Sequence, residues 1–275
     1  MLSDYARSAN PTYAHHHQGH HLHTILKRLL APLLLSICQI SHATQPLDTY
    51  LTISTGSLPI VLSVPHGGEV LLHGAAERAK GTRVQDDRVN ELAAAIQRQL
   101  LAKTGKEAYL VGARISRKYV DFNRRAEEAY ASPDAAPVYA AYYGALRLFV
   151  DRVRTQPGAL LVDIHGQSFK RDVVFRGTGS GLTARNAQFY GEPDGLITRL
   201  NAAGLHVEPD TAEAKEQHFS GGTIVRVFGY QAPQGIDSVQ LEFGASLRTT
   251  PARIEQTAAI VADALIRHLL AAHGQ

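Results

Sequence analysis

Two histidines and a glutamate lie where a hydrolytic enzyme could hold a metal ion. His66 follows the apolar run 60–64, Glu69 comes three residues later across two glycines, and a second apolar run, 160–164, leads directly into His165. Glycines let the backbone turn tightly, so the side chains of His66 and Glu69 can converge on one ion. Three protein ligands leave the fourth position of zinc open for water, as in catalytic sites. The spacing therefore predicts a metal-dependent hydrolase.

Asp163 precedes His165 by two residues on the same predicted strand, so both side chains point to the same face of a sheet. We expect its carboxylate to lie behind the imidazole and to fix the tautomer of the ring. Each residue also has an ordinary interpretation. A histidine at a strand end can bond a buried carbonyl, and an aspartate can belong to a turn.

Glu242 stands between two apolar residues in the run 238–243. An unpaired carboxylate buried there would cost several kcal/mol, so something must compensate it. The structural interpretation is a salt bridge to an arginine. The functional one is a general base that takes a proton from the attacking water and later protonates the leaving amine.

Asn123 and Arg124 follow the strand-like segment 119–122. The planar fork of an arginine suits a carboxylate, so Arg124 could clamp an anionic substrate or polarise the carbonyl that is cleaved. The alternative is an ordinary surface arginine. Upstream, Asp86 and Asp87 precede a predicted helix, and we expect at least one of them to cap it.

The elements that must position these residues alternate between strands and helices. This alternation predicts a single α/β domain with a mostly parallel, mixed sheet flanked by helices, and chemistry at the carboxyl ends of the strands. Periodicity and turn residues predict strands at 51–54, 60–64, 108–111, 160–164, 173–175, 223–227 and 238–243, and helices at 86–101, 138–153 and 251–270.

The first 43 residues have the pattern of a leader with a signal peptide. Lys27 and Arg28 precede the apolar segment 29–40, and small residues end at Ala43, after which we expect cleavage. The apolar segment is shorter than the ~20 residues of a membrane span, so we expect no stable membrane insertion. Residues 44–275 would form the enzymatic domain, in the periplasm or secreted.

The charge and the cysteine content of the chain exclude some classes of partner and ligand. Three basic residues and one acidic residue lie within 1–43, so without them the net charge falls from +3 to about +1. No basic tract remains that could neutralise a row of phosphates, and we expect no nucleic-acid partner. The only cysteine, Cys38, lies in the leader, so the remaining chain has no disulfides and no thiolate metal ligands.

Five short blocks, in this order, resemble those of the N-formylglutamate amidohydrolase family. They are Pro65-His66-Gly67-Gly68, Asp86-Asp87-Arg88, Val120-Asp121-Phe122-Asn123-Arg124, Asp163-Ile164-His165-Gly166, and Gly221-Gly222-Thr223 through Phe228-Gly229 to Val239-Gln240-Leu241-Glu242.

That family is similar in turn to zinc carboxypeptidases, so the resemblance implies a phosphorylase/hydrolase-like (zinc carboxypeptidase-like) fold with one Zn²⁺ per chain. It implies metal binding by His66, Glu69 and His165. It also implies that Asn123 and Arg124 recognise the substrate carboxylate and that Glu242 is the general base.

Two departures from the family pattern bear on the substrate. Gly67 and Gly166 stand where members commonly have serine, which predicts more space around the metal. The family's usual task is intracellular, whereas this chain has the pattern of an exported protein. We therefore expect hydrolysis of an amide in an N-acyl amino acid or a small peptide with a free carboxylate. A cell-wall or polyglutamate peptidase and an inactive exported binding module remain as alternatives.

Overall fold

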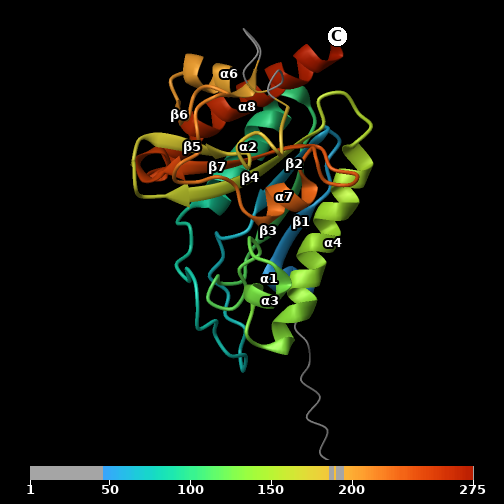
Figure 1. Ribbon diagram of the computed structural model, residues 1–275, viewed down its shortest axis with the longest axis vertical. Coiled ribbons are helices and arrows are strands. Elements are labelled where there is room, and N and C mark those ends of the chain that lie inside the picture. The colour runs from blue at the N-terminus through green and yellow to red at the C-terminus, as the bar shows by residue number, and fades with distance from the viewer. Residues whose placement is uncertain (1–45, 186–188, 190–194, 275) are drawn as a thin grey trace, which may run out of the picture. The chain divides into compact units, whose positions relative to one another are not determined.

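Seven strands of the described residues form one sheet in the computed structural model, which describes residues 46–185, 189 and 195–274. The strand order is β1-β3-β2-β4-β7-β5-β6 (Figure 1). The strands are β1 (Leu51–Ser54), β2 (Ile60–Val64), β3 (Tyr109–Ala113), β4 (Leu160–Gln167), β5 (Val173–Gly177), β6 (His206–Glu208) and β7 (Asp237–Gly244).

The centre of the sheet is parallel. Strands β3, β2, β4 and β7 all run in one direction, whereas β1 pairs with β3 and β5 pairs with β7 in the antiparallel sense. The chain moves outward from β2 to β3 and then returns across β2 to β4, so the strand order reverses between β2 and β4. In open α/β sheets, ligands bind at the carboxyl ends of the strands beside such a reversal.

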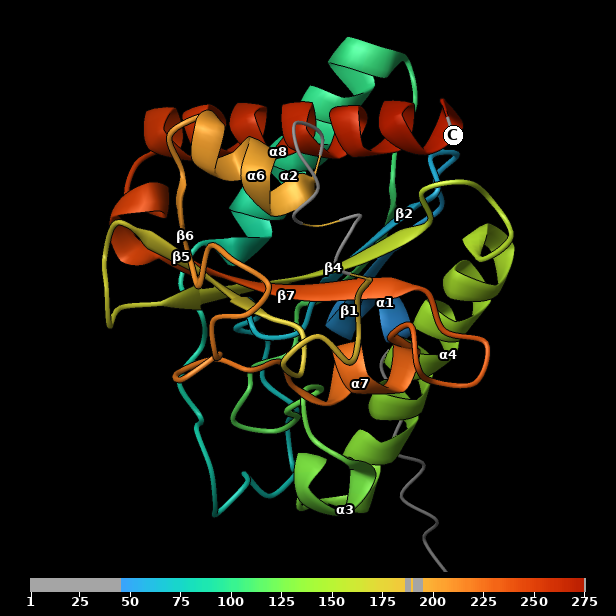
Figure 2. The ribbon, with the colours of Figure 1, turned by 45° about the horizontal axis from the view of Figure 1, so that its top comes forward.

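Helices cover both faces of the sheet (Figure 2). Helices α2, α6 and α8 lie on one face, and α4 and α7 lie on the other. The helices are α1 (Leu47–Tyr50), α2 (Val89–Thr104), α3 (Ala126–Ala129), α4 (Ala136–Val153), α6 (Leu196–Ala202), α7 (Thr223–Phe228) and α8 (Pro251–His273), with 3₁₀ turns η1 (Pro133–Ala135) and η2 (Ala245–Arg248).

The alternation of side chains along the central strands divides the core between these two layers. In β2, Ile60, Leu62 and Val64 pack with α2 and α8, whereas Val61 packs with α4 on the opposite face. Every residue of this strand is buried, as expected for a parallel strand covered on both sides. Buried neighbours on both faces hold the end of β2, and hence the start of the loop that carries His66, in a fixed position.

The predicted α/β domain with a mostly parallel sheet flanked by helices is confirmed. Two predicted strands are wrong. Residues 223–227 lie in α7, and 119–122 form turns in which buried Val120 and Phe122 anchor an irregular segment. A short apolar run has the same composition in a buried helix turn as in a strand, so periodicity does not separate the two. Helix α6 and strand β6 were not predicted.

Residues 1–43, predicted to be a leader and signal peptide, lie outside the described residues. None of the helices in the described part of the chain combines the length and the apolar character needed to cross a bilayer.

Candidate metal centre and active site

The register of the three central strands brings the predicted site residues together. His165 in β4 lies directly opposite Glu242 in β7, and Asp163 lies opposite Ser63 in β2. His66 follows the end of β2 by two residues. Hydrogen bonding between parallel strands fixes these positions to within a residue, so the two histidines and Glu242 meet at one edge of the sheet.

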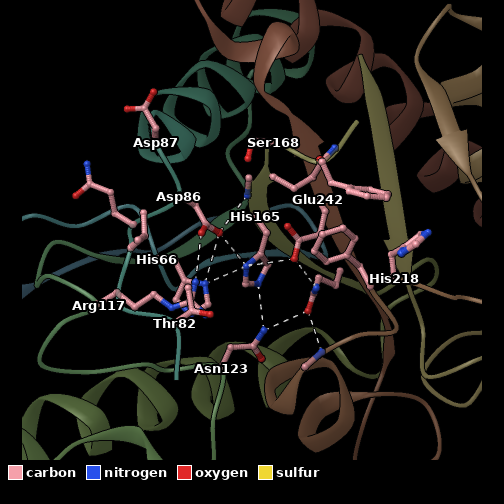
Figure 3. A pocket seen from close by; sticks show the side chains of 18 of the residues that line it. His66, Thr82, Asp86, Asp87, Arg117, Asn123, His165, Ser168, His218 and Glu242 are labelled. Atoms are coloured by element: carbon pink, nitrogen blue, oxygen red, sulfur yellow. Dashed lines mark hydrogen bonds and ion pairs between the residues drawn. The ribbon is translucent and has the colours of Figure 1, made fainter. Parts of the chain in front are cut away.

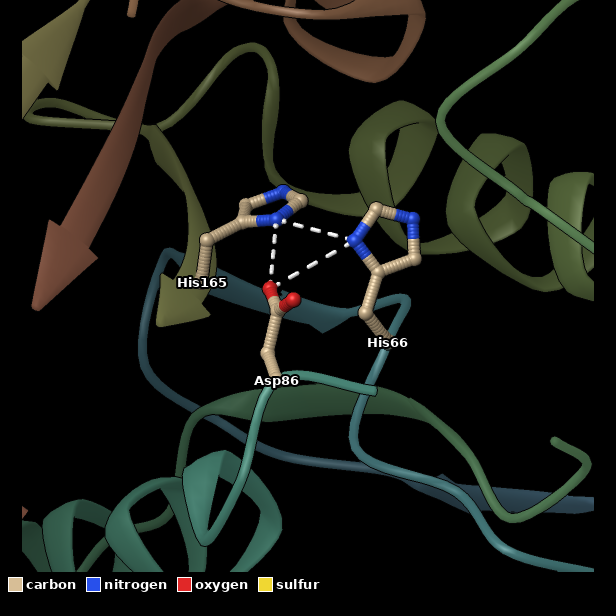
Figure 4. A group of neighbouring side chains, drawn as sticks. All are labelled: His66, Asp86 and His165. Carbon is tan, nitrogen blue, oxygen red and sulfur yellow. Dashed lines mark hydrogen bonds and ion pairs between the residues drawn. The ribbon is translucent and has the colours of Figure 1, made fainter. Parts of the chain in front are cut away.

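Three ligand atoms converge at this edge (Figure 4). The Nδ1 atoms of His66 and His165 are 3.1 Å apart, and the Asp86 Oδ2 atom lies 3.5 Å from the first and 3.2 Å from the second. Tetrahedral zinc with bonds of ~2.0–2.1 Å places its ligand atoms about 3.3 Å apart. The two imidazoles and the carboxylate therefore fit a zinc-sized ion in both donor chemistry and spacing.

The far side of each imidazole fixes which nitrogen carries the proton. His66 Nε2 lies 2.7 Å from Asp121 Oδ1, and His165 Nε2 lies 2.9 Å from Asp163 Oδ2. A carboxylate only accepts, so both Nε2 atoms donate and both Nδ1 atoms present lone pairs. Two lone pairs and the anionic oxygen of Asp86 then face one another, and this arrangement requires a cation or a proton between them.

Asp86 is also held from behind. Its Oδ1 atom lies 3.4 Å from Arg117 Nη1, while its Oδ2 atom accepts the Gly166 backbone N–H at 3.1 Å. Arg117 in addition donates from Nε and Nη2 to Asp121 at 3.1 Å each. Each of the three candidate ligands thus has a charged partner on its far side, as ligand residues in metal sites commonly do.

The metal-free electrostatics agree with this geometry. Burial would raise the pKa of Asp86, but hydrogen bonds from His165 and His66 outweigh it and hold that pKa well below its usual range. Burial would lower the pKa of His165, but the charges of Asp163 and Glu242 raise it well above its usual value. The site therefore attracts positive charge, and without a metal a proton takes that place.

The structure does not bring Glu69 to this group. Residues 68–70 run extended beside 115–116, which carries the exposed Glu69 side chain away from the strand end. Its Oε1 atom accepts from Gln85 Nε2 at 2.6 Å instead. Asp86 occupies the place that we expected Glu69 to take, because the chain leaves the strand end after His66 and returns to it twenty residues later.

The expectation that Asp86 or Asp87 caps a helix is wrong. Helix α2 begins at Val89, its N-cap residue is Arg88, and no side chain caps it. The position of Asp86 in one of the blocks that carry the family resemblance was a signal for a functional role. Its sequence distance from His66 gave no hint that the two side chains meet.

Glu242 lies beside the three candidate metal ligands. The residue is 7% exposed, and its Oε1 atom lies 3.9 Å from His165 Nδ1 and accepts from Gln240 Nε2 at 2.8 Å. Burial raises the pKa of Glu242 to about 7. A carboxyl group with this pKa can both take up and release a proton near neutral pH, which is what a general acid–base group requires.

Asn123 and Arg124 line the same cavity in different ways. Asn123 is buried, and its side chain contacts His165 Nε2 at 3.3 Å and donates to Gln240 at 3.2 Å. Its side-chain carbonyl oxygen accepts the Ile224 N–H, so each end of the amide has one partner. Arg124 is half-buried and donates to the backbone oxygen of Asn123. Among the described residues, no carboxylate forms an ion pair with Arg124, so its charge is available to a ligand.

The candidate ligands and Glu242 open into a cavity of about 680 Å³ (Figure 3). The expectation that Gly67 and Gly166 widen it is wrong, since neighbouring side chains fill the space. A Cβ at Gly67 would lie 2.5 Å from Asn90 Oδ1, and one at Gly166 would lie 2.6 Å from Arg248 Cζ. The Arg248 guanidinium donates to the carbonyls of residues 87, 167 and 243, so it joins three segments around the site.

No protein-family model matches this sequence, and no curated protein matches it. Solved structures do match. The N-formylglutamate amidohydrolase of Ralstonia eutropha JMP134 superposes with a TM-score of 0.56 at 18% identity, covering 82% of this chain and 98% of that one. The product of gene Atu2144 from Agrobacterium tumefaciens gives 0.54 at 16% identity, covering 82% and 95%. At such identities the likeness is one of fold, and at that level it confirms the resemblance predicted from the motifs.

Proposed function

We propose that this protein is an exported, zinc-dependent amidohydrolase that cleaves the amide of an N-acyl amino acid or small peptide bearing a free carboxylate. The observation that carries the proposal is the convergence of His66 Nδ1, His165 Nδ1 and Asp86 Oδ2 within 3.1–3.5 Å of one another, beside Glu242. In this proposal the metal ligands are His66, Asp86 and His165, with Asp86 in place of Glu69.

The ion, when bound, supplies Lewis acidity for the carbonyl and for the attacking water. The chain supplies the rest. Glu242 accepts a proton from the water and delivers it to the leaving nitrogen, a double role that suits a buried carboxyl group beside the candidate ligands. Asp163 and Asp121 keep the Nδ1 lone pairs of the two imidazoles directed at the site.

Arg124 places the substrate. It lines the cavity at the segment that follows Asn123, and among the described residues it forms no ion pair. A free carboxylate on the amino-acid part of the substrate would complete its charge and fix which amide bond lies beside Glu242. Asn123 donates one amide hydrogen to Gln240, and the His165 Nε2 beside it already donates to Asp163 and cannot accept, so in this proposal the second amide hydrogen is available to the substrate.

The fold supports an amide as the bond that is cleaved, because the Ralstonia protein with this arrangement of strands is an N-formylglutamate amidohydrolase. The ligand atoms of His66, His165 and Asp86 support the binding of a metal ion. Two nitrogens and one oxygen suit zinc, although the neighbouring first-row ions accept the same ligands. The leader pattern in 1–43 supports export.

The experiment that tests this function uses residues 44–275, purified without the His-rich leader and loaded with zinc. We expect about one zinc per chain by elemental analysis, and release of amine from a panel of N-acyl amino acids and short peptides. Glu242→Gln should keep the metal and lower turnover by ~10²-fold or more.

Metal-loaded protein that binds but does not cleave any member of the panel would favour the inactive binding module. Cleavage restricted to cell-wall peptides or polyglutamate would favour the peptidase alternative. Full turnover by Glu242→Gln would remove that residue from the mechanism.

A further inference from the structure

Two large apolar side chains lie exposed at the catalytic cavity. Among the large hydrophobic side chains that the structure describes as exposed, Val84 at 73% and Phe169 at 61% are the two most exposed. Both line the cavity that contains the candidate metal ligands. Exposed apolar residues scattered singly need no explanation, but two that border one functional cavity indicate a surface that is covered when a ligand binds.

Phe169 is part of an aromatic group at one end of this cavity. Its ring centroid lies 4.6 Å from that of His218 and 6.1 Å from that of Phe175, which in turn lies 5.1 Å from Phe219. Phe175 is buried in β5, whereas Phe169, His218 and Phe219 line the cavity. We call these three residues the aromatic rim.

Packing within the protein explains the position of Phe219 but not the exposure of Phe169. Contacts with Phe175 account for the position of Phe219 and stabilise the loop that carries it. They leave most of the Phe169 ring in water, where it gains nothing for folding. An apolar ligand group placed against Phe169 would remove that surface from water, with a favourable free energy that the free protein does not obtain.

The segment that carries His218 and Phe219 is held in place before any ligand binds. Glu216 is buried, forms an ion pair with Arg176 of β5 and accepts the Thr178 backbone N–H at 2.8 Å. A preorganised surface costs less conformational entropy on binding than a mobile one. Two of the three rim residues therefore lie on a segment that is ordered before a ligand binds.

The rim and Arg124 belong to different walls of the cavity. Arg124 follows Asn123 in the segment between β3 and α3, whereas the rim comes from the loops after β4 and β6. In Figure 3, Asn123 lies below His165, and His218 lies beyond Glu242 on the side away from His66. An amide beside Glu242, with its amino-acid carboxylate at Arg124, would direct its acyl group toward the rim.

We propose that the aromatic rim, together with Val84 in the segment before Asp86, is the acyl subsite, and that it selects an aryl or other bulky apolar acyl group over formyl. This inference rests on the proposed function and adds the class of acyl group. A cavity of about 680 Å³ falls within the ~300–1,000 Å³ of pockets that take drug-sized ligands, so it has room beyond a formyl group.

The test compares N-phenylacetyl, N-acetyl and N-formyl derivatives of one amino acid, chosen as the best leaving group in the panel. The variant is Phe169→Ala and its matched control is Leu182→Ala, since Leu182 is 56% exposed and does not line the cavity. We expect Phe169→Ala to lower kcat/KM about 10-fold for the phenylacetyl substrate and to leave the formyl substrate within about twofold. Leu182→Ala should change neither.

A second measurement does not depend on turnover. Calorimetric titration of the zinc-loaded protein with phenylacetate and with acetate should show tighter binding of phenylacetate, and Phe169→Ala should remove the difference. If formyl and phenylacetyl substrates are cleaved equally well, or if phenylacetate binds no better than acetate, the acyl subsite is refuted while the amidohydrolase stands. If phenylacetate binds preferentially but no amide is cleaved, the subsite stands and the proposed function fails.

Discussion

Replacing Glu242 by glutamine should stabilise the metal-free protein, and by an amount that depends on pH. Burial raises the pKa of Glu242 from its ordinary value of 4.5 to about 7. A pKa raised by folding means that the protonated form is favoured in the native state. The stability that it contributes is fully present below pH 4.5 and is lost as the pH rises to about 7.

The magnitude follows from the two pKa values. At about 1.4 kcal/mol per pKa unit, ionising Glu242 costs the metal-free fold about 3 kcal/mol by pH 8. Glutamine resembles the protonated carboxyl group in shape and charge, and its carbonyl oxygen can still accept from Gln240. The free energy of unfolding of Glu242→Gln minus that of the wild type should therefore grow by about 3 kcal/mol between pH 4.5 and pH 8.

Urea denaturation of both proteins at pH 4.5, 6 and 8, in the presence of a chelator, measures this difference. Zinc loading provides the control, because a cation beside Glu242 favours the carboxylate and should shrink the gap at pH 8. A difference that stays constant from pH 4.5 to pH 8 without metal would refute the reasoning, since Glu242 would then ionise as easily in the native state as in the unfolded chain.

Four further substitutions test the metal centre and the packing around it. Asp86→Asn should abolish stoichiometric zinc binding by elemental analysis, whereas Glu69→Gln should retain about one ion per chain, and the opposite result would restore Glu69 as the ligand. Asp163→Asn should weaken zinc binding by ~10–100-fold in a competition assay with a chelator, because the acceptor behind His165 loses its negative charge and the imidazole becomes a weaker ligand. Gly166→Ala should destabilise the fold by about 1–3 kcal/mol in thermal or urea unfolding, since the Arg248 guanidinium must leave its carbonyl partners, and unchanged stability would show that the guanidinium moves freely.

Three residues of the site could be found from the sequence because of their positions at the ends of apolar strands. His66, His165 and Glu242 each lie in or within two residues of an apolar run that forms a buried central strand. Parallel strands of an α/β sheet end at one edge, so polar residues at those positions converge whatever the details of packing. Arg124 was found from its side-chain chemistry, which suits a carboxylate.

Tertiary structure alone decided which carboxylate joins the histidines. Nearness in sequence favoured Glu69, but residues 68–70 pair with 115–116 and carry it away, while the segment that ends in Asp86 folds back over the strand end. Likewise, the missing side chain of Gly166 suggested open space, and the Arg248 guanidinium fills it from far along the chain. Local sequence patterns fix which residues end a strand. The side chains that meet across the site depend on where long loops return, and long-range packing sets that position.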